Sequence, residues 1–199
     1  MSKPFLTVLE NFDQLFDTDY LDEFRNLAGL SLRRQRRAIE KESESINQLE
    51  DDDEGHTADY ASHIEDRWVL LQDVENLAGQ ILVVALYRQT ELHIKRVVKR
   101  AHPNVDMRNL FIFEKLKKVV PFDIEILPKF ATFNELRLLN NSVKHQGKVS
   151  DELSDKFPSW KHGEELIGLD AAYERMKPEV AEFIRHFVNS CHQAKKTQP

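Results

Sequence analysis

Three polar residues, Arg137, Asn141 and His145, follow one another at intervals of four residues. On an α-helix this spacing places them in one row, because side chains at positions i and i+4 lie on the same face. An imidazole with a pKa of about 6.5 can take a proton from a ribose 2′-hydroxyl or give one to a leaving oxygen. A guanidinium can stabilise the charge that develops on the phosphate, and asparagine can orient either group. The row therefore suits metal-independent RNA cleavage.

The same residue types also occur at the solvated end of an ordinary helix. Lys144 and His145 would be favourable there, because cations interact well with the C-terminal end of a helix dipole. The residue types alone leave both interpretations open.

A second polar set lies earlier in the chain, where Arg88, Glu91 and Lys95 are spaced i, i+3 and i+7. They could face the same crevice as the first row and, with Asn140 and Lys144, bind a substrate. The same spacing is typical of a ladder of ion pairs on a helix surface.

Helices must position these residues, because six glycines and few alternating valines and threonines leave little material for sheets. Apolar residues recur instead at the i, i+3 and i+4 spacing of helices, which predicts an all-α fold. Thr132 and Glu135 have the spacing of a capping box, and Gly147 stands where a helix would have just ended. The expected helices cover residues 5–27 with a break near 17–19, 31–48, 58–101, 107–119, 132–146, and 170–195 with a restart at Pro178.

An acidic segment, "LEDDDEGHTADY" at residues 49–60, indicates a loop and an internal boundary, since like charges repel and offer nothing to pack. We therefore expect an N-terminal helical extension with an acidic loop at residues 1–54 and a helical bundle at residues 55–199. The net charge of −6 argues against a protein that coats nucleic acid, although "RRQRR" at residues 33–37 is locally basic.

Other classes of function lack their sequence signals. The start has no signal-peptide pattern and the longest apolar run, residues 81–87, is too short to cross a bilayer, so we expect a cytoplasmic protein without a membrane partner. A single cysteine, Cys191, excludes an internal disulfide. No glycine-rich phosphate loop and no HExxH motif occur, so neither a metal nor a cofactor is predicted.

The segment "FNELRLLNNSVKHQGKVSDEL", preceded by "LAGQILVVALYRQTELHIKRVVK" and "NLFIFEKLKKV", resembles HEPN-domain proteins. The resemblance covers residues 59–193. That all-helical superfamily is rich in toxins and antiphage-defence ribonucleases. The resemblance implies a four- or five-helix bundle and a homodimer that brings two motif helices together into a composite RNA-cutting site.

The family motif is an arginine, four to six further residues, and a histidine. His145 matches the histidine, and Asn141 stands where a polar residue often follows the arginine. Asn140, however, occupies the position where the four-residue spacing would place the arginine, and Arg137 lies one turn too early.

Two functions follow from this departure. In the first, the chain is an endoribonuclease in which His145 is the acid and base, Arg137 stabilises the phosphate and Asn141 orients. In the second, it is a catalytically degenerate HEPN-like module that binds RNA, a nucleotide or a protein. The N-terminal helices would then recruit a partner such as an antitoxin.

Overall fold

The structure is a computed structural model that describes residues 3–46, 54–106, 108, 110 and 112–197. It is 78% helical, and no strand occurs among these residues, which confirms the predicted all-α class. The helices of the described chain are α1 (Lys3–Gln14), α2 (Asp19–Ile46), α3 (Glu54–Ala101), α4 (Phe113–Val119), α5 (Phe130–His145), α6 (Asp151–Lys156) and α7 (Leu169–Thr197).

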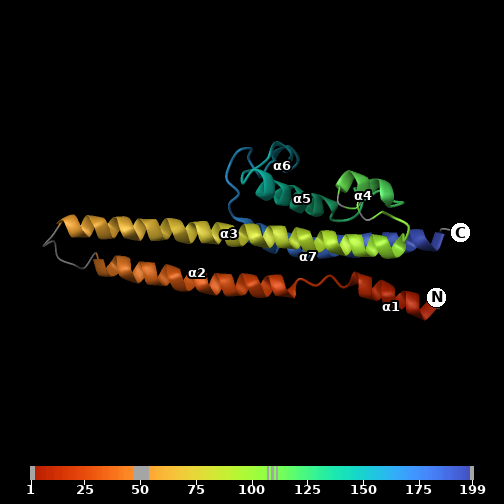
Figure 1. The fold of residues 1–199 in the computed structure, drawn as a ribbon, viewed down its shortest axis with the longest axis horizontal. Helices are drawn as coiled ribbons and strands as arrows, with labels where there is room; N and C mark the ends of the chain where they lie inside the picture. The colour runs from red at the N-terminus through yellow and green to blue at the C-terminus, as the bar shows by residue number, and fades with distance from the viewer. Residues whose placement is uncertain (1–2, 47–53, 107, 109, 111, 198–199) are drawn as a thin grey trace.

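The molecule is elongated because its longest helices lie side by side (Figure 1). Helices α2 and α3 run antiparallel, and α7 lies along the second half of α3. The shorter α4, α5 and α6 gather on one side of this layer (Figure 1). Helix α1 and the C-terminal part of α7 meet at the end of the molecule opposite the α2–α3 tip.

Helix α7 forms the middle of the core. Its apolar side chains recur at helical spacing and are fully buried, among them Tyr173, Met176, Phe183 and Phe187. The rings of Phe133 from α5 and Phe183 stack with their centroids 4.5 Å apart. Each such aromatic side chain removes a large apolar area from water, so α5 and α7 hold each other in place.

The N-terminal helix is attached through a buried carboxylate. Asp13 of α1 is only 2% exposed, and its carboxylate is paired with Arg100 of α3 and with His192 of α7, whose Nε2 lies 3.1 Å away. The ring Nε2 of His93 lies 2.6 Å from the Asp13 carbonyl oxygen. Burial lowers the pKa of His93, so the neutral ring donates this hydrogen bond.

Helix α2 is held along α3 by ion pairs that set its register. Arg36 lies 3.1 Å from Glu75, and Arg67 is paired with Glu42. The boundary predicted near residue 54 lies at the start of α3, but whether residues 1–54 form a separate unit stays a prediction.

Two predicted helix boundaries in the N-terminal half were wrong. Helix α2 continues through Ser31, where a new helix was expected, since Leu32 and Ile39 pack towards α3 from the same helix as Leu21. Helix α3 begins at Glu54, so part of the acidic segment expected to be a loop is helical. The rest of that segment, apart from the helical residues 54–60, lies outside the described residues. The predicted break at residues 17–19 and the end at Ala101 are confirmed within about two residues.

The predicted capping box was also wrong. Helix α5 begins at Phe130, after Lys129 in the left-handed conformation with φ 63°. The Thr132 hydroxyl donates to Glu179, and Glu135 lies within α5 rather than capping it. At the other end Gly147 has φ 66°, as expected for a residue that ends a helix.

The last helix and the loops before it differ in detail from the expectation. Helix α7 runs through Pro178 without a restart. The connection at residues 148–168 contains the short α6 and an isolated antiparallel bridge between Lys148 and Glu165. The helix predicted from residue 107 begins at Phe113, and residues 107, 109 and 111 lie outside the described chain.

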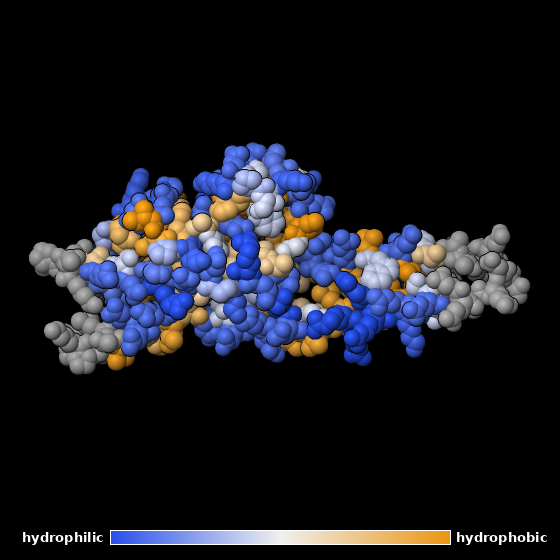
Figure 2. Space-filling view, turned by 180° about the vertical axis from the view of Figure 1, so that it is seen from behind, coloured by the Kyte–Doolittle hydropathy of each residue, from blue (hydrophilic) through white to orange (hydrophobic). Residues whose placement is uncertain are grey.

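Apolar side chains also reach the surface. Figure 2 shows a mostly hydrophilic face with separate hydrophobic patches, several of them along the α2–α3 end. One segment of α3, Asp59–Ala101, is long and apolar enough to cross a membrane by length and composition. The core helix of a soluble protein passes the same test, and the cytoplasmic location stays a prediction.

Helices α2 and α3 form an antiparallel hairpin, and replacing one glycine in each by alanine is expected to change the stability of the protein in opposite directions. A Cβ at Gly79 would lie 3.0 Å from Leu169 Cβ and 3.1 Å from the Asp170 backbone nitrogen, so α7 would have to move. We expect Gly79→Ala to lower the free energy of unfolding by about 1–2 kcal/mol despite the better helix propensity of alanine. Gly29→Ala meets only the flexible end of Arg33 and should raise stability by up to about 1 kcal/mol. Thermal and urea unfolding of both variants measure this, and a stabilised Gly79→Ala would contradict the close packing.

Candidate functional site

The predicted row lies on the open side of α5. Nine of the 16 residues of this helix are buried, including Leu136, Leu139 and Asn140. Arg137 and Asn141 are half-buried, while Lys144 and His145 are exposed in the last turn. The His145 end of the row is therefore accessible, and the row spans about 12 Å from Arg137 to His145 at the helical rise of ~1.5 Å per residue.

Arg137 is held firmly at its place. Its Nε donates to Asn134 Oδ1 at 3.0 Å, and its Nη2 lies 3.1 Å from Glu152 Oε1 of α6. The guanidinium carbon lies 5.0 Å from the centre of the Phe113 ring, which is a cation–π arrangement. Only 14% of the Arg137 side chain is exposed. Both the N–H groups and the flat face of the Arg137 guanidinium are therefore already engaged by other residues of the same chain.

The other members of the row are less constrained. The Asn141 side-chain oxygen accepts a long hydrogen bond of 3.4 Å from Asn140 Nδ2. The side chains of Lys144 and His145 make no hydrogen bond or ion pair with any other described residue. The structure thus does not bring Arg137 and His145 into contact within one chain.

Asn140 continues the buried stripe of Phe133 and Leu136 and is 2% exposed. Its side-chain oxygen has no hydrogen-bond partner among the described residues. A buried carbonyl oxygen without a partner destabilises a fold by about 1–3 kcal/mol. The position at which the HEPN motif would place arginine therefore points into the protein.

Arg88, Glu91 and Lys95 form the predicted ladder of ion pairs. The distances are 3.1 Å from Arg88 to Glu91 and 3.0 Å from Lys95 to Glu91, with Lys95 4% exposed on its side chain. Burial, followed by the charge of Glu91, raises the pKa of Tyr87 to about 12, while the charge of Arg137 opposes this. The charges of Glu91 and Arg137 thus both act on Tyr87, where α3 meets α5.

An open cleft of about 500 Å³ adjoins Arg137. Its charged lining is more acidic than basic, with three carboxylates against two cations. The carboxylates are Glu114, Glu125 and Glu152, and the cations are Arg137 and Lys156. Lys117 lies 3.2 Å from Glu114 and 2.9 Å from Glu125, so the charges around this cleft balance, and it lacks the positive potential that phosphate binding needs.

The structure also contains polar sites that the sequence did not indicate. Glu135 is buried and bound on both oxygens by Arg175, at 3.0 and 2.7 Å, and it accepts a hydrogen bond of 2.9 Å from Trp160 Nε1. The spacing of Glu135 from Thr132 suggested a helix cap. Its actual partners could not be found from the local sequence, because they lie 25 and 40 residues away. Among the described residues no group of three or more His, Cys, Asp and Glu could hold a metal ion.

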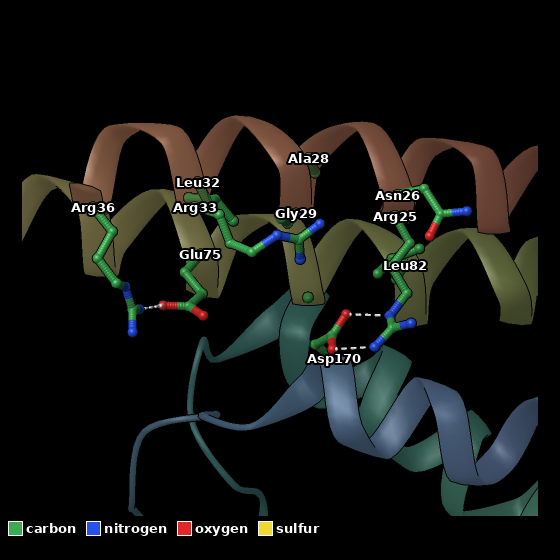
Figure 3. Close-up of a pocket in the computed structure, with 12 residues that line it drawn as sticks. Arg25, Asn26, Ala28, Gly29, Leu32, Arg33, Arg36, Glu75, Leu82 and Asp170 are labelled. Atoms are coloured by element: carbon green, nitrogen blue, oxygen red, sulfur yellow. Dashed lines mark hydrogen bonds and ion pairs between the residues drawn. The ribbon is translucent and has the colours of Figure 1, made fainter. Parts of the chain in front are cut away.

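A pocket of about 280 Å³ lies where α2 and α3 meet the start of α7 (Figure 3). Its arginines point at acidic residues: Arg25 binds Asp170 through two hydrogen bonds of 2.6 and 2.7 Å, and Arg36 binds Glu75. Arg33 from the basic run points into the same pocket (Figure 3). Carboxylates neutralise Arg25 and Arg36, so these two arginines join the helices that form the pocket.

Comparisons of the chain with protein-family models, with curated proteins and with solved structures find no match. The HEPN resemblance therefore stays a prediction that rests on the residues of the α5 segment.

Proposed function

We propose that the chain is a catalytically degenerate HEPN-like helical module that binds a protein partner. The observation that carries this proposal is the state of Arg137, whose guanidinium is already neutralised by Glu152 and stacked on Phe113. An RNA phosphate would have to displace Glu152 and then approach Glu114 and Glu125 in the same cleft. The other cations at this cleft are paired as well, since Lys117 binds Glu114 and Glu125 and Lys156 binds Glu152, so a phosphate would have to break ion pairs to bind there.

Two further features support a protein partner over RNA. Asn140 replaces the expected arginine and is buried, so the motif position contributes no second guanidinium for a phosphate. Exposed apolar side chains gather on the hairpin, for example Leu27 of α2 and Leu70 of α3, which are 58% and 62% exposed. Apolar surface of this kind is typical of protein interfaces.

The test of this proposal is an RNA-cleavage assay. We expect the purified full chain to cleave neither structured nor single-stranded RNA in the presence of EDTA, and His145→Ala to behave identically. Gel analysis of end-labelled RNA over hours measures this. Cleavage by the wild type that disappears in His145→Ala would contradict the proposal, while cleavage unaffected by His145→Ala would indicate a contaminating nuclease.

A second candidate function, a homodimeric metal-independent endoribonuclease, is favoured by the exposed imidazole of His145, which forms no hydrogen bond or ion pair with another described residue and lies beside Lys144. Two such histidines could approach one another across a dimer. In that case Glu152→Gln, which keeps the shape of the side chain and removes its charge, should release Arg137 and raise cleavage. Glu164→Gln, at an exposed glutamate in the loop after α6, is the matched control. Equal absence of cleavage in both variants would count against the nuclease.

A further inference from the structure

Four apolar side chains form an exposed seam on α3. Leu70, Val74, Leu77 and Ile81 are 62%, 46%, 54% and 43% exposed, respectively. They follow one another at intervals of four, three and four residues, which is the heptad spacing of helices that pack against another helix. A helix in water gains nothing from such a row unless another surface covers it.

Helix α2 widens this seam into a face made of two helices. Ala28, Ser31 and Gln35 of α2 line a mainly apolar groove together with Leu70 and Val74. At 100° per residue, Phe24 and Leu27 lie on the same side of α2 as Ser31. They are 36% and 58% exposed. This hairpin face is on the other side from the pocket of Figure 3, where Arg25 binds Asp170 at the start of α7 and Arg36 binds Glu75.

The hairpin face, defined by Phe24, Leu27, Leu70, Val74, Leu77 and Ile81, has the shape of half a four-helix bundle. Two helices with one shared apolar side become stable in water when a second pair covers them. A second copy of the same hairpin supplies this pair with matching length and spacing.

Charges along the two edges of the face are complementary to each other. Exposed Arg34 and Lys41 lie on the α2 edge, and exposed Asp66 and Asp73 lie on the α3 edge. The ion pairs Arg36–Glu75 and Arg67–Glu42 set the register of the antiparallel helices. Arg34 is therefore level with Asp73 to within about one turn of 5.4 Å, and Lys41 is level with Asp66 to the same degree.

We infer that the hairpin face binds a second copy of this chain, related by a two-fold axis parallel to the helices. This axis places α2 of one protomer over α3 of the other and leaves the level of each residue along the helices unchanged. Arg34 then meets the partner's Asp73, and Lys41 meets the partner's Asp66. The inference rests on the proposed function, because it names a second copy of the chain as one protein partner of the module.

The first test is the molar mass of the full chain in solution, by light scattering and sedimentation. We expect twice the 23.3 kDa of one chain. Leu70→Glu combined with Leu77→Glu should weaken the dimer about 30-fold or more, since charges would be buried at the centre of the interface. Ile126→Glu, at a loop residue that is 77% exposed, is the matched control and should leave the dimer intact. A monomeric wild type, or a dimer that survives the double substitution, overturns the inference.

The second test uses charge reversal and keeps the apolar face unchanged. Arg34→Asp and Asp73→Arg should each weaken self-association, because each places like charges opposite each other in its own dimer. An equimolar mixture of the two variants should form a heterodimer that restores both opposite-charge pairs. Failure of the mixture to associate more tightly than either variant alone overturns the proposed axis.

A membrane is the alternative occupant of the hairpin face. The full chain should not float with vesicles of phosphatidylcholine and phosphatidylglycerol, and flotation that Leu70→Glu with Leu77→Glu abolishes would overturn the second-copy assignment. These measurements are separate from the RNA assay: a monomer that cuts no RNA leaves the proposed function standing, and a dimer that cuts RNA leaves the hairpin interface standing.

Discussion

Asp13→Ala is expected to lower the free energy of unfolding by about 3 kcal/mol, because it removes the shared acceptor of a buried charge network. The Asp13 carboxylate is 2% exposed and binds Arg100 of α3 and His192 of α7. Without it, the Arg100 guanidinium loses its partner. The loss falls at the lower end of the range for broken buried pairs, since 31% of the Arg100 side chain is exposed and can gain water. Urea unfolding followed by circular dichroism measures the change.

Two controls separate the network from general damage to the N-terminal segment. Glu23→Ala replaces an exposed carboxylate on α2 and should change stability by less than about 0.5 kcal/mol. Asp13→Ala combined with Arg100→Met should be less destabilising than the sum of the two single changes, because the second substitution removes the charge left unpaired. An additive double variant, or an Asp13→Ala protein as stable as the wild type, would mean that the network does not hold α1 in place.

The features predicted correctly are those whose cause lies close by in the sequence. The end of α3 at Ala101 follows from Pro103, and the end of α5 follows from Gly147 with its positive φ. The helical periodicity of the apolar residues was sufficient for the all-α class, because each helix buries a stripe of its own residues.

The features predicted wrongly depend on partners far along the chain. Thr132 and Glu135 have the spacing of a capping box, yet their side chains bind Glu179 and Arg175, which are 47 and 40 residues away. Tertiary partners outcompeted the local cap. The local sequence likewise gives no sign that Asp13 is buried in an ion pair, because its partner Arg100 is 87 residues away.

The candidate site divides in the same way. Helical geometry alone placed Arg137, Asn141 and His145 in one row, and the row does lie on the side of α5 that is not buried. The engagement of Arg137 could not be predicted, because Glu152 and Phe113 approach it from α6 and α4. The direction in which Asn140 points depends on how the other helices cover α5, which buries nine of its positions.

Asn140→Arg is expected to destabilise the fold by more than about 3 kcal/mol and to create no RNA cleavage. The side chain at this position is 2% exposed, so an arginine would bring both excess volume and an unpaired charge into the core. If the position faced a catalytic site instead, the substitution would restore the Arg-x4-His spacing of the HEPN motif and produce cleavage. Thermal unfolding and the RNA assay on the same preparation distinguish the two results.

Asn140→Leu is the matched control for this substitution. Leucine has nearly the shape of asparagine and removes the side-chain oxygen that lacks a partner among the described residues. We expect it to keep the stability of the wild type within about 1 kcal/mol or to raise it. A stable Asn140→Arg protein would show that residue 140 reaches solvent, and the degenerate-module proposal would then depend on Arg137 alone. A destabilised Asn140→Arg beside an intact Asn140→Leu means that the motif arginine was replaced where the fold requires an uncharged side chain.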